Sequence, residues 1–554
     1  MVKLLLFIRA IFKWRNKTGF GTDCFVASML LVLHGSLPVP VAPDWSRTAR
    51  AQARHVGSVN FPTDCASAVQ PTIEEGLALL HSFQYEEAAQ AFGKASERDP
   101  PCALAFWGMA MALYHPLWEF PNPQILALGW HDVEQAEKLK VTDPRVRGYI
   151  DAAAAFFQPE ELTPLARVQA YSLAMEKLHR DQPQDNEAAE FYALSLIALA
   201  QRGVHDLPDR QKAIAILKPI LSQYPDNPGA AHYLIHAADV RELASEGLAA
   251  AQVYAKIAPD SAHALHMPSH IFRRLGLWQE MIDSNLASAG AARAATKAPH
   301  GNSDYALHAM DFLDYGYLQY GQEAEARRLL AELKTVPRAS ATDIIDAQSR
   351  FAARNALELH RWKEAATLDL PKEPLVWQDY TYWSRAIGAA RSGDAVGARN
   401  DVQKLVAIAE ILKSSAQQGN SRTPAGMGID PREAAGWLAY AEGKAEEAER
   451  ILRSAADRED ASDVEPFATP AREMLADLLL ELHRPEEALA AYRETLKNFP
   501  NRFDALYGGA RAADALGDRR NAVDFYAKLM ANCSRNADRP ELTEARSYVE
   551  GHSY

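Results

Sequence analysis

Histidines are the residues of this chain whose spacing is suited to chemistry. His232 and His236 are four residues apart, and so are His266 and His270. Side chains four residues apart share one face of a helix, so each pair can chelate a transition-metal ion. His266 follows His232 by 34 residues, and His270 follows His236 by the same number. The sequence therefore predicts two imidazole pairs at equivalent positions of two successive repeated units.

A third unit downstream contributes similar residues. Gly276 and Gly321 are interpreted as equivalent turns 45 residues apart, and His263 and His308 are also 45 residues apart. Because equivalent first helices of stacked repeats lie side by side, their side chains are expected to point toward one region. The full candidate site then consists of His232, His236, Asp239, His263, His266, His270, Arg273, His308, Asp311 and Tyr315.

Three interpretations of this site remain open. In the first, His232, His236, His266 and His270 bind a divalent transition metal such as Zn, Cu, Ni or Fe, with Asp239 or Asp311 as a further ligand or as an orienting group. In the second, the histidines line a groove that binds a protein, a peptide or a small ligand. In the third, they only pack. A metal requires ligand atoms that converge on one point, whereas a peptide groove spreads them out.

A proline interrupts the second histidine pair. Pro268 lies between His266 and His270, where an interior helical proline removes a backbone hydrogen bond. Either a new helix begins near Met267, or one helix continues with a kink.

The rest of the chain is rich in Ala, Leu and Glu and contains an internal repeat. "YEEAAQAFGKASERDP" has Ala88, Phe92 and Ala95 before Pro100, and "PEEALAAYRETLKNFP" repeats this arrangement near the C-terminus. Strand patterns, a glycine-rich phosphate loop, a serine nucleophile elbow and an HExxH motif are not found in the sequence.

These spacings resemble the tetratricopeptide repeat, whose units are pairs of antiparallel helices of about 34 residues. The resemblance implies an all-α fold, a right-handed α-solenoid of helix-turn-helix repeats whose first helices line a concave groove. We expect these segments: 1–53 export signal, 54–68 linker, 69–227 N-terminal repeats, 228–335 histidine-rich repeats, 336–430 degenerate repeats, and 431–554 C-terminal repeats and tail.

A narrower resemblance rests on "HYLIHAAD", "HALHMPSHIFRRLG" and "DPPCALAFWGMA". These stretches look like large exported bacterial tetratricopeptide-repeat proteins that have no assigned activity. The resemblance implies fold and compartment, and it implies no reaction. A protein or peptide partner is expected from the repeats.

Composition and the N-terminus bear on partners and compartment. The net charge of −13 disfavours nucleic acid as a partner, because phosphate binding needs a basic surface. Basic residues up to Lys17, an apolar run from Phe25 and the stretch "ARAQA" predict an export signal cleaved near Ala51 or Ala53, hence a periplasmic or secreted protein. Only an uncleaved signal would leave it membrane-anchored. In an oxidising compartment Cys65 and Cys102 are the candidate disulfide, and the alternative is that they are buried thiols.

Overall fold

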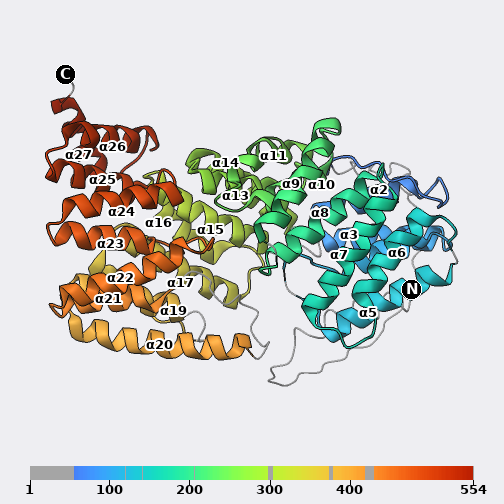
Figure 1. Ribbon diagram of the computed structural model, residues 1–554, viewed down its shortest axis with the longest axis horizontal. Coiled ribbons are helices and arrows are strands. Elements are labelled where there is room, and N and C mark those ends of the chain that lie inside the picture. Colours follow the sequence, from blue (N-terminus) through green and yellow to red (C-terminus); the bar gives the residue numbers. More distant parts are fainter. Residues whose placement is uncertain are drawn as a thin grey trace, which may run out of the picture. The chain divides into compact units, whose positions relative to one another are not determined.

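The computed structural model describes residues 55–552 except 119, 140, 205, 297–303, 373–377 and 418–428. The predicted export signal and its cleavage sites lie outside this range. All regular elements among the described residues are helices, and Figure 1 shows successive helices lying side by side. The fold is an all-α solenoid, as the repeats predict.

The helices follow one another as antiparallel pairs. In the first half these are α2 (Gln70–His81) with α3 (Tyr85–Arg98), α4 (Ala103–Met111) with α5 (Pro123–Lys138), α6 (Pro144–Phe157) with α7 (Pro164–Asp181), α8 (Asn186–Ala200) with α9 (Asp206–Gln223), and α10 (Pro228–Ala238) with α11 (Ala244–Ile257). Next come α12 (Ala262–His266) and α13 (Pro268–Leu275), which together pair with α14 (Trp278–Ala295).

The second half continues in the same way. Its pairs are α15 (Asp304–Gln319) with α16 (Glu323–Glu332), α17 (Ala341–Glu358) with α18 (Trp362–Ala365), α19 (Gln378–Arg391) with α20 (Ala395–Gln417), α21 (Pro431–Ala441) with α22 (Ala445–Asp460), α23 (Ala471–Glu481) with α24 (Pro485–Asn498), and α25 (Phe503–Ala515) with α26 (Arg519–Ala531). Helix α27 (Glu541–His552) ends the stack, and a short 3-10 turn (Leu333–Thr335) follows α16.

The turn inside a pair has one recurring backbone conformation. A residue with left-handed φ ends the first helix, and the next N–H donates to a carbonyl five residues back, as Leu277 N does to Phe272 O at 2.8 Å. Glycine adopts this conformation without strain. It occupies the position at Gly276, Gly321, Gly393, Gly443 and Gly517, whereas other units have Phe83, His360 or His483 there. Gly276 and Gly321 are thus equivalent turns, as predicted.

The aromatic residue of the repeat packs against a glycine of the following helix. A Cβ atom at Gly108 would lie 2.4 Å from the Phe92 ring, and one at Gly508 would lie 2.3 Å from the Tyr492 ring. Both rings are buried. Successive helices can therefore approach closely at these two points, which is the packing that the repeat pattern predicts.

Pro268 kinks a helix that otherwise continues. It is the first residue of α13, and the preceding Met267 keeps helical angles of φ −51° and ψ −37°. His263 and His266 lie on α12 before the kink, and His270 lies on α13 after it. The histidines thus remain on a nearly continuous helical segment.

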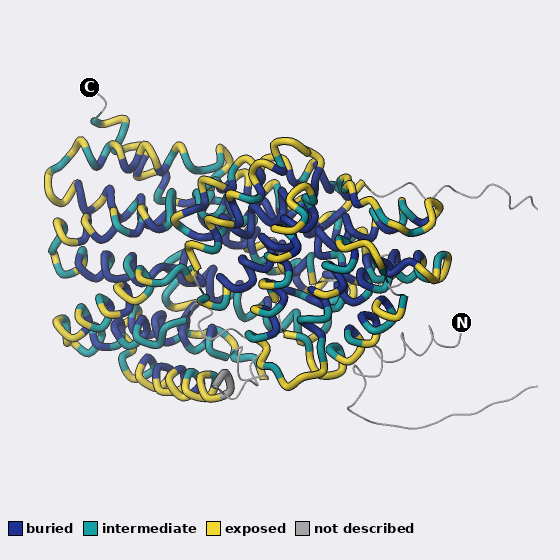
Figure 2. Tube along the Cα trace, turned by 45° about the vertical axis from the view of Figure 1, so that its right-hand side comes forward, coloured by how far each residue is buried: buried dark blue, intermediate teal, exposed yellow. Residues whose placement is uncertain are grey.

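Repeats far apart in sequence contact one another. Near the N-terminus, Ser58 N donates to Asp226 O at 3.0 Å. Near the C-terminus, Trp278 Nε1 donates to Asn501 O at 2.9 Å, and Ser534 N donates to Tyr320 O at 3.0 Å. Figure 2 shows buried residues gathered where helices meet and exposed residues along their outer faces. No described helix is long and apolar enough to cross a membrane.

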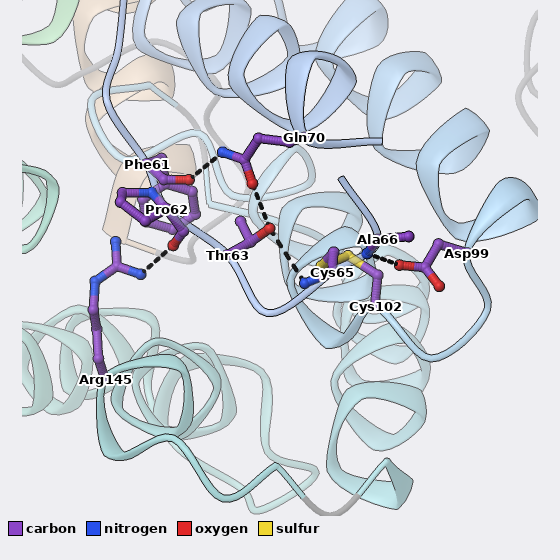
Figure 3. The surroundings of a disulfide bond; sticks show 9 residues. All are labelled: Phe61, Pro62, Thr63, Cys65, Ala66, Gln70, Asp99, Cys102 and Arg145. Atoms are coloured by element: carbon purple, nitrogen blue, oxygen red, sulfur yellow. Dashed lines mark hydrogen bonds between the residues drawn. A yellow bond between two sulfur atoms is a disulfide. The ribbon is translucent and has the colours of Figure 1, made fainter. Parts of the chain in front are cut away.

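A disulfide joins the segment before α2 to the start of α4. Cys65 and Cys102 are bonded, and neighbouring hydrogen bonds hold the same segment: Ala66 N donates to Asp99 Oδ2 at 2.6 Å, and Arg145 Nη1 donates to Pro62 O at 2.8 Å (Figure 3). The remaining described cysteine, Cys533, is free.

Candidate metal centre

Three buried histidines converge at the start of the central repeats. His232 Nε2 lies 3.0 Å from His236 Nε2 and 3.1 Å from His263 Nε2. The first two residues lie on α10 and the third on α12. Their exposed fractions are 0%, 7% and 5%, so the cluster is closed to solvent. We call His232, His236 and His263 the inner triad.

A backbone carbonyl fixes the orientation of His232 in the inner triad. His232 Nδ1 lies 2.6 Å from the carbonyl oxygen of His81, at the end of α2. A carbonyl oxygen only accepts, so Nδ1 carries the proton and the lone pair of Nε2 faces the other two imidazoles. A metal-ligating histidine is typically oriented in this way through its second nitrogen.

Aromatic side chains surround the inner triad. The Phe83 ring meets the ring of His232 edge-on at 4.4 Å, and the Tyr254 ring stacks on His232 at 5.2 Å, measured between ring centres. Burial lowers the pKa of His232 to about 3 and lowers the pKa values of His236 and His263 well below the ordinary value. All three imidazoles are therefore neutral near pH 7, the form that binds metals.

A second triad follows directly along the same helices. His266 Nε2 lies 3.1 Å from His270 Nε2, and the ring of His308, from α15, is centred 4.4 Å from that of His266. One ligand atom from each of these three residues lies within 4.8 Å of the other two. His266 is buried, His270 is half-buried and His308 is exposed. We call His266, His270 and His308 the outer triad.

Two acceptors fix the orientation of His266 and His270 in the outer triad. His266 Nδ1 lies 2.6 Å from Asn285 Oδ1, and Asn285 Nδ2 donates to Met281 O, which leaves the amide oxygen to accept. His270 Nδ1 lies 3.0 Å from Asp239 Oδ2. Both Nδ1 atoms are donors, so both Nε2 atoms turn toward each other. Two lone pairs at this separation repel unless a proton or a metal ion lies between them.

The spacing of the nitrogens suits a shared ion. Ligands at the 2.0–2.2 Å bond lengths of a tetrahedral zinc site are roughly 3.3 Å apart. The Nε2 separations of 3.0 Å and 3.1 Å in the two triads are close to this value. Imidazole sets of this kind suit Zn, Cu, Ni and Fe.

The two triads are neighbours. The rings of His236 and His270 are centred 6.4 Å apart, and so are the rings of His263 and His266. The structure therefore divides the four ligands expected from the sequence between two sets. His232 and His236 belong to the inner triad, and His266 and His270 belong to the outer one.

The other candidate residues lie around the triads. Asp239 orients His270 and also accepts from Arg274 Nε at 3.0 Å. Arg273 pairs with Glu465 at 2.8 Å. Asp311 pairs with Arg350 and Arg354, each at 3.0 Å, and Arg502 donates to the Tyr315 hydroxyl at 2.8 Å. Ion pairs and hydrogen bonds with α17 and the C-terminal repeats thus engage Arg273, Asp311 and Tyr315.

The residues around the triads that were not expected from the sequence include His81, Phe83 and Asn285. Phe83 had a signal, because it occupies a turn position where five other units have glycine. A bulky side chain with a φ of 54° is strained. The sequence contains no comparable signal for His81 and Asn285, because their contacts depend on how repeats and helices come together in space.

Comparisons with known proteins find only distant structural likenesses. No protein-family model and no curated protein matches the chain. A tetratricopeptide repeat protein from Parabacteroides merdae is 12% identical, covers 52% of this chain and 97% of its own, and has a TM-score of 0.29. A human IFIT1 dimer with PPP-AAAA is 12% identical (82% and 89% covered, TM-score 0.32), and yeast Tom70 is 10% identical (87% and 95% covered, TM-score 0.25). The helix pairs and turns of this chain themselves define a solenoid of the tetratricopeptide type.

Proposed function

We propose that this protein is a transition-metal protein in which the solenoid holds two adjacent ions, one in each histidine triad. One observation carries the proposal: six imidazoles converge as two sets of three. In each set one ligand atom from every histidine lies within 4.8 Å of the other two, and the closest Nε2 atoms are 3.0 Å to 3.1 Å apart. Three of the six have their Nδ1 atoms held by His81 O, Asn285 and Asp239. Such outer contacts are typical of metal-ligating histidines.

The proposal assigns different roles to the two triads. Three protein ligands leave one position of a tetrahedral ion for water or substrate. The inner triad is enclosed, whereas the outer triad has an exposed His308. The outer ion is therefore the one positioned to exchange ligands and to act as a Lewis acid on a bound molecule.

The alternative of a histidine-lined recognition groove receives less support. A groove for a peptide needs accessible side chains spread along the surface, yet His232, His236, His263 and His266 are buried. A solenoid of this type is nonetheless a scaffold that offers extended binding surfaces. A partner would then bind to other faces of the repeats, while the triads bind the metal ions.

Export is part of the proposal. The predicted signal with cleavage near Ala51 or Ala53 would deliver the chain to the periplasm or the medium. The Cys65–Cys102 disulfide supports this location, since structural disulfides persist in oxidising compartments.

The test is metal content measured by elemental analysis. The full chain, purified without a histidine tag, is loaded with Zn²⁺ or Cu²⁺ and desalted. His236→Ala should remove about one equivalent relative to the unaltered chain, His270→Ala should remove another, and the double variant should lose both. His483→Ala is the matched control, because it removes an exposed imidazole outside the triads.

Circular dichroism confirms that each variant is folded before metal is counted. The proposal fails if the unaltered chain binds less than one equivalent of either ion. It also fails if folded His236→Ala and His270→Ala proteins keep the full content.

A further inference from the structure

A third cluster of ligating side chains lies behind the inner triad. We propose that His81, Glu187 and Glu190 form a separate site for a divalent cation such as Zn²⁺ or Mn²⁺. His81 ends α2, and the two glutamates lie three residues apart on one face of α8. This inference does not depend on the proposed function of the triads.

The three side chains already lie close together. His81 Nε2 is 2.6 Å from Glu187 Oε2 and 3.6 Å from Glu190 Oε2. All three residues are at most 1% exposed. A small outward movement of Glu187 would bring these atoms to the separation of about 3.3 Å that ligands of one ion require.

Neighbouring groups orient the ligands. The Tyr233 hydroxyl lies 2.9 Å from His81 Nδ1, the nitrogen that does not face the glutamates. Asn227 Nδ2 donates to Glu190 Oε1 at 2.7 Å. His81 Nε2 and Glu190 Oε2, the other polar atoms of these two side chains, are therefore directed into the cluster.

One buried carboxylate oxygen has nothing to bind. Among the described residues, Glu190 Oε2 has no hydrogen-bond partner, although Glu190 is fully buried. An unsatisfied buried oxygen costs roughly 1–3 kcal/mol, and more if it is charged. A cation held by Glu190 Oε2 and its two neighbours would satisfy it.

Charge balance favours the same conclusion. Within the described part of the chain, neither Glu187 nor Glu190 forms an ion pair with lysine or arginine, and His81 is their sole basic partner. One divalent cation with a neutral imidazole neutralises both carboxylates. Otherwise two protons must do so, one on His81 and one on a glutamate.

The backbone makes room for the cluster at Gly229. A Cβ atom there would lie 2.1 Å from Glu190 Oε2 and 2.6 Å from His81 Nδ1. A surface cavity of about 200 Å³ is lined by Asn186, Glu187 and Asn227, among other residues, and so offers an approach to Glu187. The site is thus compact, and an ion would reach it through this cavity.

His81 also connects this site to the inner triad. Its side chain faces the glutamates while its carbonyl oxygen accepts from His232 Nδ1. An ion bound by the His81 side chain would fix the position of that carbonyl, and through it the orientation of His232.

The experiment uses the full chain with both triads disabled by His236→Ala and His270→Ala. This protein is loaded with Zn²⁺ or Mn²⁺ alone. We expect it to retain about one equivalent of the ion and to show a higher melting temperature when the ion is bound. Glu190→Gln should abolish both the bound equivalent and the rise in melting temperature. Glu246→Gln, which alters an exposed glutamate on α11, is the matched control and should change neither quantity.

Gly229→Ala provides a second, independent variant, and its added methyl group should also exclude the ion. The inference is overturned if the triad-less protein binds neither ion, and equally if folded Glu190→Gln keeps the equivalent. An infrared carbonyl band of a protonated carboxyl group that disappears in Glu190→Gln would show that protons neutralise the cluster instead. Failure of the triads alone would leave this equivalent intact, so the two proposals are tested separately.

Discussion

At the scale of single residues, the site depends on which nitrogen of each imidazole carries the proton. His81 O, Asn285 Oδ1 and Asp239 Oδ2 each accept from an Nδ1 atom and so turn the opposite Nε2 inward. The sequence identified all six histidines by spacing. It could not show that His263 joins His232 and His236. Equivalent positions in stacked repeats place side chains on a shared face, but they do not specify how far one helix is shifted along its neighbour.

Asn285 provides the residue-scale prediction. Asn285→Leu keeps the volume and removes the acceptor for His266, so the affinity of the outer triad for Zn²⁺ should fall by about 10- to 100-fold. The measurement is competition with a chromophoric chelator in the His236→Ala background. Asn285→Asp keeps an acceptor and should bind far more tightly than the leucine variant. Equal affinities for the two variants would contradict the role given to Asn285.

At the scale of elements, the turns between paired helices were predictable where glycine marks them. His483 adopts the same left-handed conformation with a φ of 59°, in an exposed turn between α23 and α24. His483→Gly should raise the free energy of unfolding by about 1 kcal/mol, because a side chain is disfavoured there. Urea unfolding measures the change, and Gly443→Ala in the corresponding turn should shift stability in the opposite direction. A His483→Gly protein that is less stable than the unaltered chain would refute this explanation of the turn.

A buried ionic network joins α17, α23 and α25. Arg502 Nη2 lies 2.9 Å from Glu473 Oε1 and 3.0 Å from both carboxylate oxygens of Glu358, so one guanidinium serves two acids. Burial raises the pKa of Glu473 from 4.5 to about 8. Between these values the folded chain holds a proton that the unfolded chain releases, so the free energy of unfolding falls as the pH rises through that window.

Glu473→Gln should therefore flatten this pH dependence. Urea unfolding at about pH 5 and about pH 8 should show a smaller loss of stability for the variant than for the unaltered chain. The comparison cancels other groups that titrate in the same window. An unchanged or steeper loss would show that Glu473 is ionised in the folded protein throughout.

At the scale of the whole molecule, repeats far apart in sequence meet. The turn after α2 contacts α10 and α12 through Phe83, and the C-terminal repeats contact the turns that follow α13 and α15. The pattern of small and aromatic residues predicted the helix pairs. It could not predict these contacts, because they depend on small rotations between repeats that add up along the stack.

The disulfide gives a prediction at this scale. The double variant Cys65→Ser and Cys102→Ser should lose about 2–4 kcal/mol of stability, because the bond restricts the unfolded chain. Denaturant unfolding followed by circular dichroism measures the loss. Adding a reductant to the unaltered chain should reproduce it, and the variant itself should not respond. Equal stability with and without the bond would contradict the prediction.

We propose that each of the two triads holds one metal ion. The most direct measurement is an anomalous difference map from a crystal of the metal-loaded full chain, recorded at the absorption edge of the bound metal. We expect two peaks. One should lie about 2.0–2.2 Å from the ligating nitrogens of His232, His236 and His263, and the other at the same distance from those of His266, His270 and His308. A map without a peak in either triad, with the imidazoles hydrogen-bonded to one another, would contradict the assignment of a metal ion to each triad.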